Sequence, residues 1–203
     1  MLLWERASDW TDDPDCTYEI KYDGYRLMAQ MCGGSVFLKT KNGADATAWF
    51  PEVVSGLSSL ASSGTMVLDG EVCILDDLGR SDFDALHRRA KTRGWVPGQP
   101  LAVYCVFDVL VVEGKHVTTL QLRERKAMLA DILSVRPPSI LGITGVVGEG
   151  EWLYQKALAL KLEGIVRKRL DSVYAPGQRG KEWAKRKVPG ATPANRFSKL
   201  QRG

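Results

Sequence analysis

Hydrophobic and polar residues alternate along several short stretches of the chain, a two-residue period that is typical of half-buried β-strands. These stretches are residues 17–31, 35–41, 66–76, 164–170 and 181–188. Residues 101–114 are almost continuously apolar and rich in valine, which predicts a buried strand. Glycine-containing pairs at 23–24, 33–34 and 42–43 predict the turns that interrupt the first run and bound the second.

Apolar residues recur at helical spacing in four other stretches. They are residues 50–60, 81–89, 123–133 and 150–162. Ser81 is the expected N-cap of the second helix. The first fifteen residues and those after Pro189 show neither period and are predicted to be irregular. Strands that follow one another with helices interspersed predict an α+β fold with antiparallel sheets, as one domain over residues 1–188 followed by an irregular basic tail at 189–203.

Composition narrows the class of protein. The chain is 44% hydrophobic and 26% charged, which is ordinary for a globular domain. No apolar run has the length of a membrane span, and charge within the first five residues argues against a signal peptide. The four cysteines form no CxxC pair, so we expect neither a zinc site nor disulfides. Unpaired thiols are typical of a reducing cytoplasm.

The charge of the chain is unevenly distributed. The net charge is +4, yet residues 167–203 carry eleven Lys or Arg against two acidic residues, a balance of +9. Such a stretch favours a polyanionic partner, for example nucleic acid. A solvated basic tail explains the same charge equally well, so charge alone leaves both interpretations open.

Residues 19–26, EIKYDGYR, place several charged groups at a strand end. Side chains alternate along a strand, so Glu19 and Lys21 share one face. A lysine is a nucleophile only after it loses its proton, which neighbouring cations favour. The candidate cations are Arg26, Lys185 and Lys187. By itself the segment could equally be a charged hairpin. The chain has no Gly-rich phosphate loop, so any nucleotide must be bound by side chains.

This segment resembles the KxDGxR motif of covalent nucleotidyltransferases, the superfamily of DNA ligases, RNA ligases and mRNA capping enzymes. Five further stretches resemble the family's other motifs in the family's order. They are TKNG at 40–43, LDGE at 68–71, VFDVL at 106–110, EGIVRK at 163–168 and WAKRK at 183–187. The resemblance covers residues 15–188 and is strongest to the ligase part of bacterial end-joining DNA ligases.

The resemblance implies a role for each matching residue in nucleotide binding. Lys21 is implied to attack the α-phosphate of ATP, release pyrophosphate and become a lysyl-AMP. Adenine contacts are implied for Glu19, the Ile20 backbone and the ring of Phe107. Ribose and phosphate contacts are implied for Arg26, Lys41 and Glu71. Lys41 stands where the family has arginine, and lysine lacks the two-pronged guanidinium, so we expect one weaker contact.

The resemblance also implies how charge is neutralised during the reaction. Lys168, Lys185 and Lys187 are implied to stabilise the phosphate charge of the transition state. Glu71 and Glu163 are implied to hold Mg²⁺, for which Mn²⁺ could substitute.

Each of these residues also has a purely structural interpretation. Phe107 lies in an apolar strand, where phenylalanine is usually part of the core. Glu71 and Glu163 could be surface carboxylates. Lys185 and Lys187 could be a solvated strand edge.

The implied activity is that of an ATP-dependent DNA ligase core, which transfers AMP to a DNA 5′-phosphate in bacterial strand joining at the nucleoid. The implied partners are nicked or broken DNA and end-joining or OB-fold proteins. Family ligases carry an OB domain after the last lysine pair, and the sixteen residues after Lys187 are too few for one. The alternatives are an RNA ligase or other nucleotidyltransferase, and a catalytically idle nucleic-acid-binding module.

Overall fold

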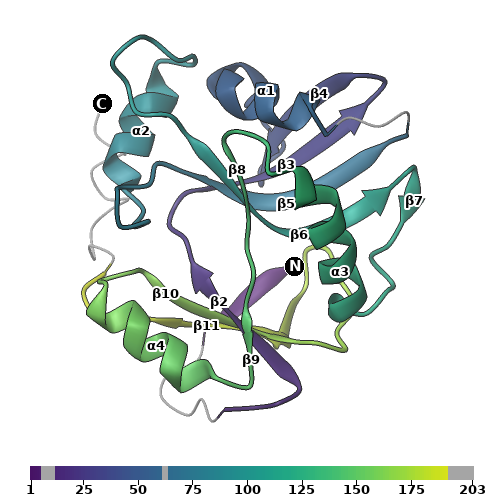
Figure 1. The fold of residues 1–203 in the computed structure, drawn as a ribbon, viewed down its shortest axis with the longest axis vertical. Coiled ribbons are helices and arrows are strands. Elements are labelled where there is room, and N and C mark those ends of the chain that lie inside the picture. The colour runs from purple at the N-terminus through teal and green to yellow at the C-terminus, as the bar shows by residue number, and fades with distance from the viewer. Residues whose placement is uncertain (6–11, 61–63, 192–203) are drawn as a thin grey trace.

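The computed structural model describes residues 1–5, 12–60 and 64–191, which form two β-sheets in two layers (Figure 1). The five-stranded sheet has the order β1 (Leu2–Glu5), β11 (Arg179–Lys187), β10 (Gly164–Arg169), β2 (Cys16–Lys21) and β9 (Val146–Val147). The six-stranded sheet has the order β4 (Ser35–Thr40), β3 (Tyr25–Cys32), β5 (Met66–Cys73), β6 (Val103–Val112) and β7 (Lys115–His116), with β8 (Ile140–Gly142) also paired to β6.

In the described residues, four α-helices cover the two sheets. They are α1 (Pro51–Ser58), α2 (Phe83–Lys91), α3 (Leu122–Ile132) and α4 (Gly150–Ala159), and two short 3₁₀ turns lie at Thr47–Trp49 and Leu133–Val135. Helices α1, α2 and α3 lie with the six-stranded sheet, where the largest apolar core forms. Helix α4 packs on β2 and β10 and closes a second core around Tyr18, Tyr154 and Ile165. The chain crosses from one sheet to the other between β2 and β3 (Figure 1).

The predicted α+β class with mainly antiparallel pairing is confirmed. Two pairings are parallel, β1 with β11 and β6 with β8. The apolar pattern over residues 17–31 predicted one strand interrupted by a turn. The structure instead has two strands in different sheets, and the interruption is the crossing between them.

Several local predictions were wrong. Residues 2–5 were expected to be irregular, but they form β1, because pairing with β11 orders a segment too short to show a period. The N-cap of α2 is Asp82, whose carboxylate accepts from the Ala85 amide at 2.8 Å. Ser81 instead accepts a hydrogen bond from the Asp23 amide. Strands β7, β8 and β9 were not predicted, and most of the expected basic tail, residues 192–203, lies outside the described residues.

Two further predictions concerned disulfide bonds and membrane-spanning segments. All four cysteines are free thiols. Within the described ranges, no helix is both long and apolar enough to cross a membrane.

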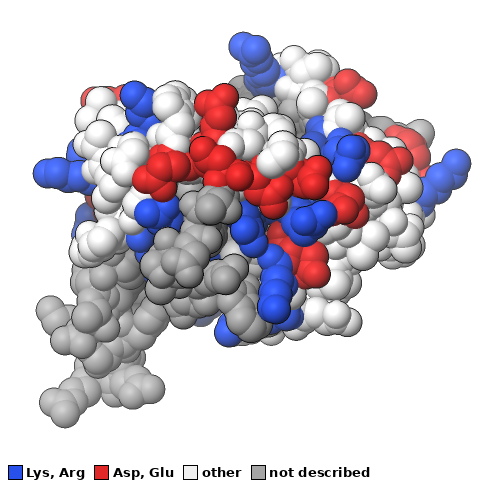
Figure 2. All heavy atoms as spheres, turned by 90° about the horizontal axis from the view of Figure 1, so that it is seen from below, with Lys and Arg blue, Asp and Glu red and all other residues white. Residues whose placement is uncertain are grey.

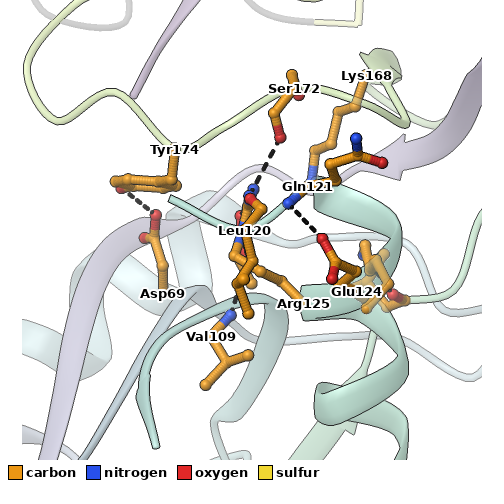
Figure 3. Close-up of polar contacts among 12 residues, drawn as sticks. Asp69, Val109, Leu120, Gln121, Glu124, Arg125, Lys168, Ser172 and Tyr174 are labelled. Atoms are coloured by element: carbon orange, nitrogen blue, oxygen red, sulfur yellow. Dashed lines mark hydrogen bonds and ion pairs between the residues drawn. The ribbon is translucent and has the colours of Figure 1, made fainter. Parts of the chain in front are cut away.

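A fully buried ion pair between Arg125 of α3 and Asp108 of β6 takes part in joining the two sheets. We call Asp108, Arg125 and Ser172 the inter-sheet cluster, and Figure 3 shows Arg125 beside Ser172. Arg125 of α3 donates to both carboxylate oxygens of Asp108 in β6, at 2.8 and 2.9 Å. Its remaining terminal nitrogen donates to the carbonyl oxygens of Leu120 and Ser172. Ser172 follows β10, so one guanidinium holds the six-stranded sheet against the connection between β10 and β11.

Replacement of Arg125 by leucine should lower the free energy of unfolding by about 3–5 kcal/mol, because it leaves the Asp108 carboxylate buried without its partner. Urea titration followed by circular dichroism measures the change. The matched control is Arg123→Leu, which removes an exposed arginine from the same helix and should cost no more than about 0.5 kcal/mol. Equal losses in the two variants would show that the inter-sheet cluster does not stabilise the fold.

Candidate active site

A pocket opens between the two sheets where the chain crosses from one to the other. Most of the residues singled out in the sequence line it, namely Glu19, Ile20, Lys21, Arg26, Glu71, Phe107 and Lys168. Cys105, Ile143 and Trp183 complete much of its wall. Residues from opposite ends of the chain thus meet in one cavity.

Lys21 is the last residue of β2 and lies at one end of this pocket. Its Nζ is 2.5 Å from Oε2 of Glu163, and Nζ of Lys187 is 3.2 Å from the other carboxylate oxygen. Glu163 is only 9% exposed, so the interpretation of this residue as a surface carboxylate is wrong. The residue after Glu163 must be a glycine for β10 to lie this close to β11, because a Cβ on Gly164 would lie 2.2 Å from the Arg186 carbonyl oxygen.

Residues 22–24, which we call the crossing segment, pass close to Glu71 of β5, and Glu71 lines the pocket as well. A Cβ on Gly24 would lie 2.1 Å from the Val72 carbonyl oxygen, so only glycine lets the chain pass this close to β5. The Gly24 amide donates to Oε1 of Glu71 at 3.2 Å. Burial raises the pKa of Glu71 to about 7, although the charges of Lys21 and Arg26 oppose the rise.

Arg26 lines the pocket wall, but protein groups already bind its guanidinium. It forms a two-pronged ion pair with Asp69 at 3.0 and 2.6 Å and donates to the Met1 carbonyl oxygen. The Tyr174 hydroxyl donates to the same Asp69 carboxylate at 2.7 Å (Figure 3). The Arg26 guanidinium also lies 5.4 Å from the centre of the Phe107 ring. These contacts fix Arg26, while its predicted contact with ribose or phosphate stays a prediction.

The other end of the pocket combines a buried carboxylate with aromatic rings. Glu19 is 2% exposed, and its two oxygens each lie 2.5 Å from a lysine nitrogen, that of Lys168 or that of Lys126. Nζ of Lys168 lies 4.6 Å from the centre of the Phe107 ring and 4.2 Å from that of Trp183. Burial lowers the pKa of Lys168 to about 8, with Lys126 adding to the effect and Glu19 opposing it.

Four predicted residues do not line the pocket: Glu163 and Lys187, which pair beside Lys21 as described above, and Lys41 and Lys185. Lys41 is exposed in the turn after β4. Lys185 is half-buried in β11, where strand alternation puts it on the same face as Trp183 and Lys187. Phe107 is half-buried, so it packs against core residues and also presents a surface to the pocket.

The sequence did not single out Lys126 or Tyr174 as site residues. Lys126 is one of several charged residues on α3, and helical periodicity does not distinguish it from its neighbours. Tyr174 lies in the connection after β10 and reaches Asp69 only when the two sheets are packed together.

The carboxylates near Lys21 suit a magnesium ion. Mg²⁺ prefers oxygen ligands and is often held by one or two carboxylates together with substrate phosphates and water. Glu71 and Glu163 supply that donor set beside the candidate nucleophile. No group of three or more metal-binding side chains gathers anywhere in the described part of the chain, so phosphate and water oxygens would complete the coordination.

Residues 5–187 match the family model of the ATP-dependent DNA ligase domain. The chain belongs to this family. It is 37% identical over 171 residues to the multifunctional non-homologous end joining protein LigD of Pseudomonas aeruginosa, covering 84% of the chain and 20% of that protein. It is 35% identical over 179 residues to a DNA ligase of Thermococcus onnurineus, covering 84% of the chain and 32% of the enzyme.

Solved structures agree with this assignment. A mycobacterial DNA ligase D complexed with ATP and MES superimposes with a TM-score of 0.72 at 26% identity, over 92% of this chain and 60% of that one. The predicted resemblance and the ligase-type nucleotidyltransferase fold are therefore confirmed. The chain spans about a fifth to a third of the two relatives named above.

The pKa of Glu71 predicts how stability depends on pH. Between pH 5 and 7 the folded state binds more protons than the unfolded state, so the free energy of unfolding should fall as pH rises. Glu71→Gln keeps the acceptor for the Gly24 amide and removes the titration. We expect the variant to gain about 1–3 kcal/mol relative to the parent between pH 5 and pH 8.

Denaturant titrations at several pH values, without metal or nucleotide, measure this gain. Glu113→Gln, at an exposed carboxylate in the turn after β6, is the control and should follow the parent. A constant difference between the Glu71 variant and the parent across the pH range would contradict the raised pKa.

Proposed function

We propose that this chain is the adenylating core of an ATP-dependent DNA ligase, which forms a lysyl-AMP at Lys21 and passes AMP to a DNA 5′-phosphate. The observation that carries the proposal is the pairing of Lys21, which lines the pocket, with the buried Glu163 beside it, together with Glu19 and Phe107 in the wall of the same pocket. This order of groups suits a nucleotide with its phosphates at the lysine and its base at the rings.

In the first step the Nζ of Lys21, once deprotonated, attacks the α-phosphorus of ATP. A phosphorus–nitrogen bond forms, and the bond from that phosphorus to the pyrophosphate oxygen breaks. Glu163 holds Nζ in place and accepts its hydrogen bond. Lys187, on the other oxygen of Glu163, brings a positive charge to the place where negative charge grows on the phosphates.

A bound Mg²⁺ would neutralise phosphate charge, with Glu163 and Glu71 as the residues that hold it. The protein supplies the rest of the positive charge from Lys185 and Lys187 of β11. Lys168 of β10 pairs with Glu19 at the proposed base end, so its phosphate contact stays a prediction. Arg26, fixed by Asp69, and the exposed Lys41 are the proposed contacts for ribose and phosphate.

The chemistry of Glu19 favours ATP over GTP. Adenine presents an amino group that donates to a carboxylate, whereas guanine presents an acceptor oxygen at the same position. Glu19 is held between two lysines that outweigh the effect of its burial and keep its pKa below the usual value. An ionised acceptor at this end of the pocket supports adenylyl over guanylyl transfer.

The proposed substrate is nicked or broken DNA in bacterial strand joining at the nucleoid, with end-joining or OB-fold proteins as partners. The end-joining name of the Pseudomonas relative supports this context. Figure 2 shows a band of acidic side chains across the face seen from below in Figure 1, with Lys and Arg beside it. That face is not uniformly basic, so the pocket end of β11, with Lys185 and Lys187, is the more suitable place for a DNA phosphate.

Lys21→Ala should abolish covalent labelling by ATP, because no other group takes the place of its amine at the end of β2. Radiolabelled ATP and magnesium followed by a denaturing gel measure the label, and circular dichroism checks the fold. Lys115→Ala, at an exposed lysine in β7, should be labelled like the parent. Label retained on the Lys21 variant would assign the nucleophile elsewhere, and labelling of the parent by GTP alone would favour guanylyl transfer.

Glu163→Gln should reduce the adenylation rate by about 100-fold or more while ATP binding changes little, since a carboxylate that holds a metal acts mainly where charge develops. Rates at low and high magnesium, together with equilibrium ATP binding, measure the two effects separately. The same dependence on magnesium as in the parent would exclude a metal-binding role for Glu163.

A further inference from the structure

Lys126 of α3 lies behind the wall of the pocket, and its side chain ends on the carboxylate of Glu19, which lines it. Its Nζ lies 2.5 Å from Oε1 of Glu19 and donates to the Ile143 carbonyl oxygen at 2.9 Å. Ile143 itself lines the pocket. The lysine is thus fixed between a pocket-wall carbonyl and a buried carboxylate, and its side chain is 18% exposed.

We infer that Lys126 is a positioning residue for nucleobase selection, which keeps the Glu19 carboxylate negatively charged and oriented toward the amino group of adenine. This inference rests on the proposed function, because it takes the Glu19 end of the pocket as the place of the base. Lys126 does not touch the nucleotide in this arrangement and acts only through Glu19.

The geometry around Glu19 supports the inference. Lys168 contacts one carboxylate oxygen and Lys126 the other, so the plane of the carboxylate is fixed from two sides. Each carboxylate oxygen can accept more than one hydrogen bond, so both keep capacity for a base in the pocket that Glu19 lines. Loss of Lys126 would free one oxygen and allow the side chain to turn.

The two lysines are not equivalent. Lys168 is buried between the rings of Phe107 and Trp183 and is also near Asp108, and burial lowers its pKa to about 8. Its charge therefore weakens at mildly alkaline pH. Lys126 keeps access to solvent, so it can balance the charge of Glu19 when Lys168 releases its proton.

Selection between bases follows from the state of this carboxylate. An ionised, fixed carboxylate accepts from the adenine amino group and repels the acceptor oxygen of guanine. A protonated carboxyl group, or one that has turned away, no longer attracts the adenine amino group and no longer repels the guanine oxygen. Removal of Lys126 should therefore weaken ATP binding and bring the two nucleotides closer in affinity.

The test compares Lys126→Met with Lys126→Arg and Arg123→Met. For Lys126→Met we expect the Kd and KM for ATP to rise about tenfold, the preference for ATP over GTP to fall about tenfold, and kcat for self-adenylation to stay within about twofold, because the Glu19 carboxylate loses one of its two ion-pair partners. Lys126→Arg keeps the charge and should recover most of the preference. Arg123→Met removes an exposed arginine from the same helix and should match the parent.

Each result of this comparison either supports the inference about Lys126 or overturns it. An unchanged Kd ratio for ATP and GTP in Lys126→Met overturns the inference, as does an equal change in Arg123→Met. Equal losses in Lys126→Met and Lys126→Arg would show a packing role and also overturn it. Because Kd is measured at equilibrium, the comparison of ATP with GTP is informative even if no self-adenylation takes place. A parent that binds ATP but is never adenylated would contradict the proposed function and leave the Kd comparison valid.

Discussion

The attachment of the two sheets to each other is the constraint on which the site depends. The pocket has walls from both sheets, so a small change in their separation would move Phe107 away from Lys168 or Glu71 away from Lys21. Arg125 resists such a change by binding Asp108 of one sheet and the carbonyl oxygen of Ser172 beside the other. The buried pair is costly to desolvate, and removing one partner leaves an uncompensated charge, so the pair penalises any other arrangement of the sheets.

A second connection lies nearer the pocket. Tyr174 donates to Asp69, and Asp69 binds Arg26, so a residue after β10 helps to fix a side chain of β3. The Arg125 guanidinium lies 5.9 Å from the centre of the Tyr174 ring, which joins this connection to the inter-sheet cluster. The two sets of contacts hold β10 and β11, with their lysines, at a fixed distance from the crossing segment.

The charges in and beside the pocket are arranged as pairs between different elements. Glu163 binds Lys21 and Lys187, while Glu19 binds Lys168 and Lys126. Paired charges can be buried at lower cost than isolated ones, which allows cations and carboxylates to be ready before a nucleotide arrives. Such preorganisation suits the proposed reaction, in which negative charge develops on phosphate oxygens.

The sequence by itself determined the periodic strands and helices, because alternation along a strand is a local property. Its motifs also identified the ligase family and the residues that lie close together within each motif. Lys21 and Glu19 on one face of β2 are an example. Only the tertiary structure decided which charges meet, since Lys168 and Glu19 are 149 residues apart. It also made a strand of residues 2–5 and brought Lys126 into the site. Local periodicity reports which face of an element is buried, whereas the partner that covers this face is set by the packing of two sheets.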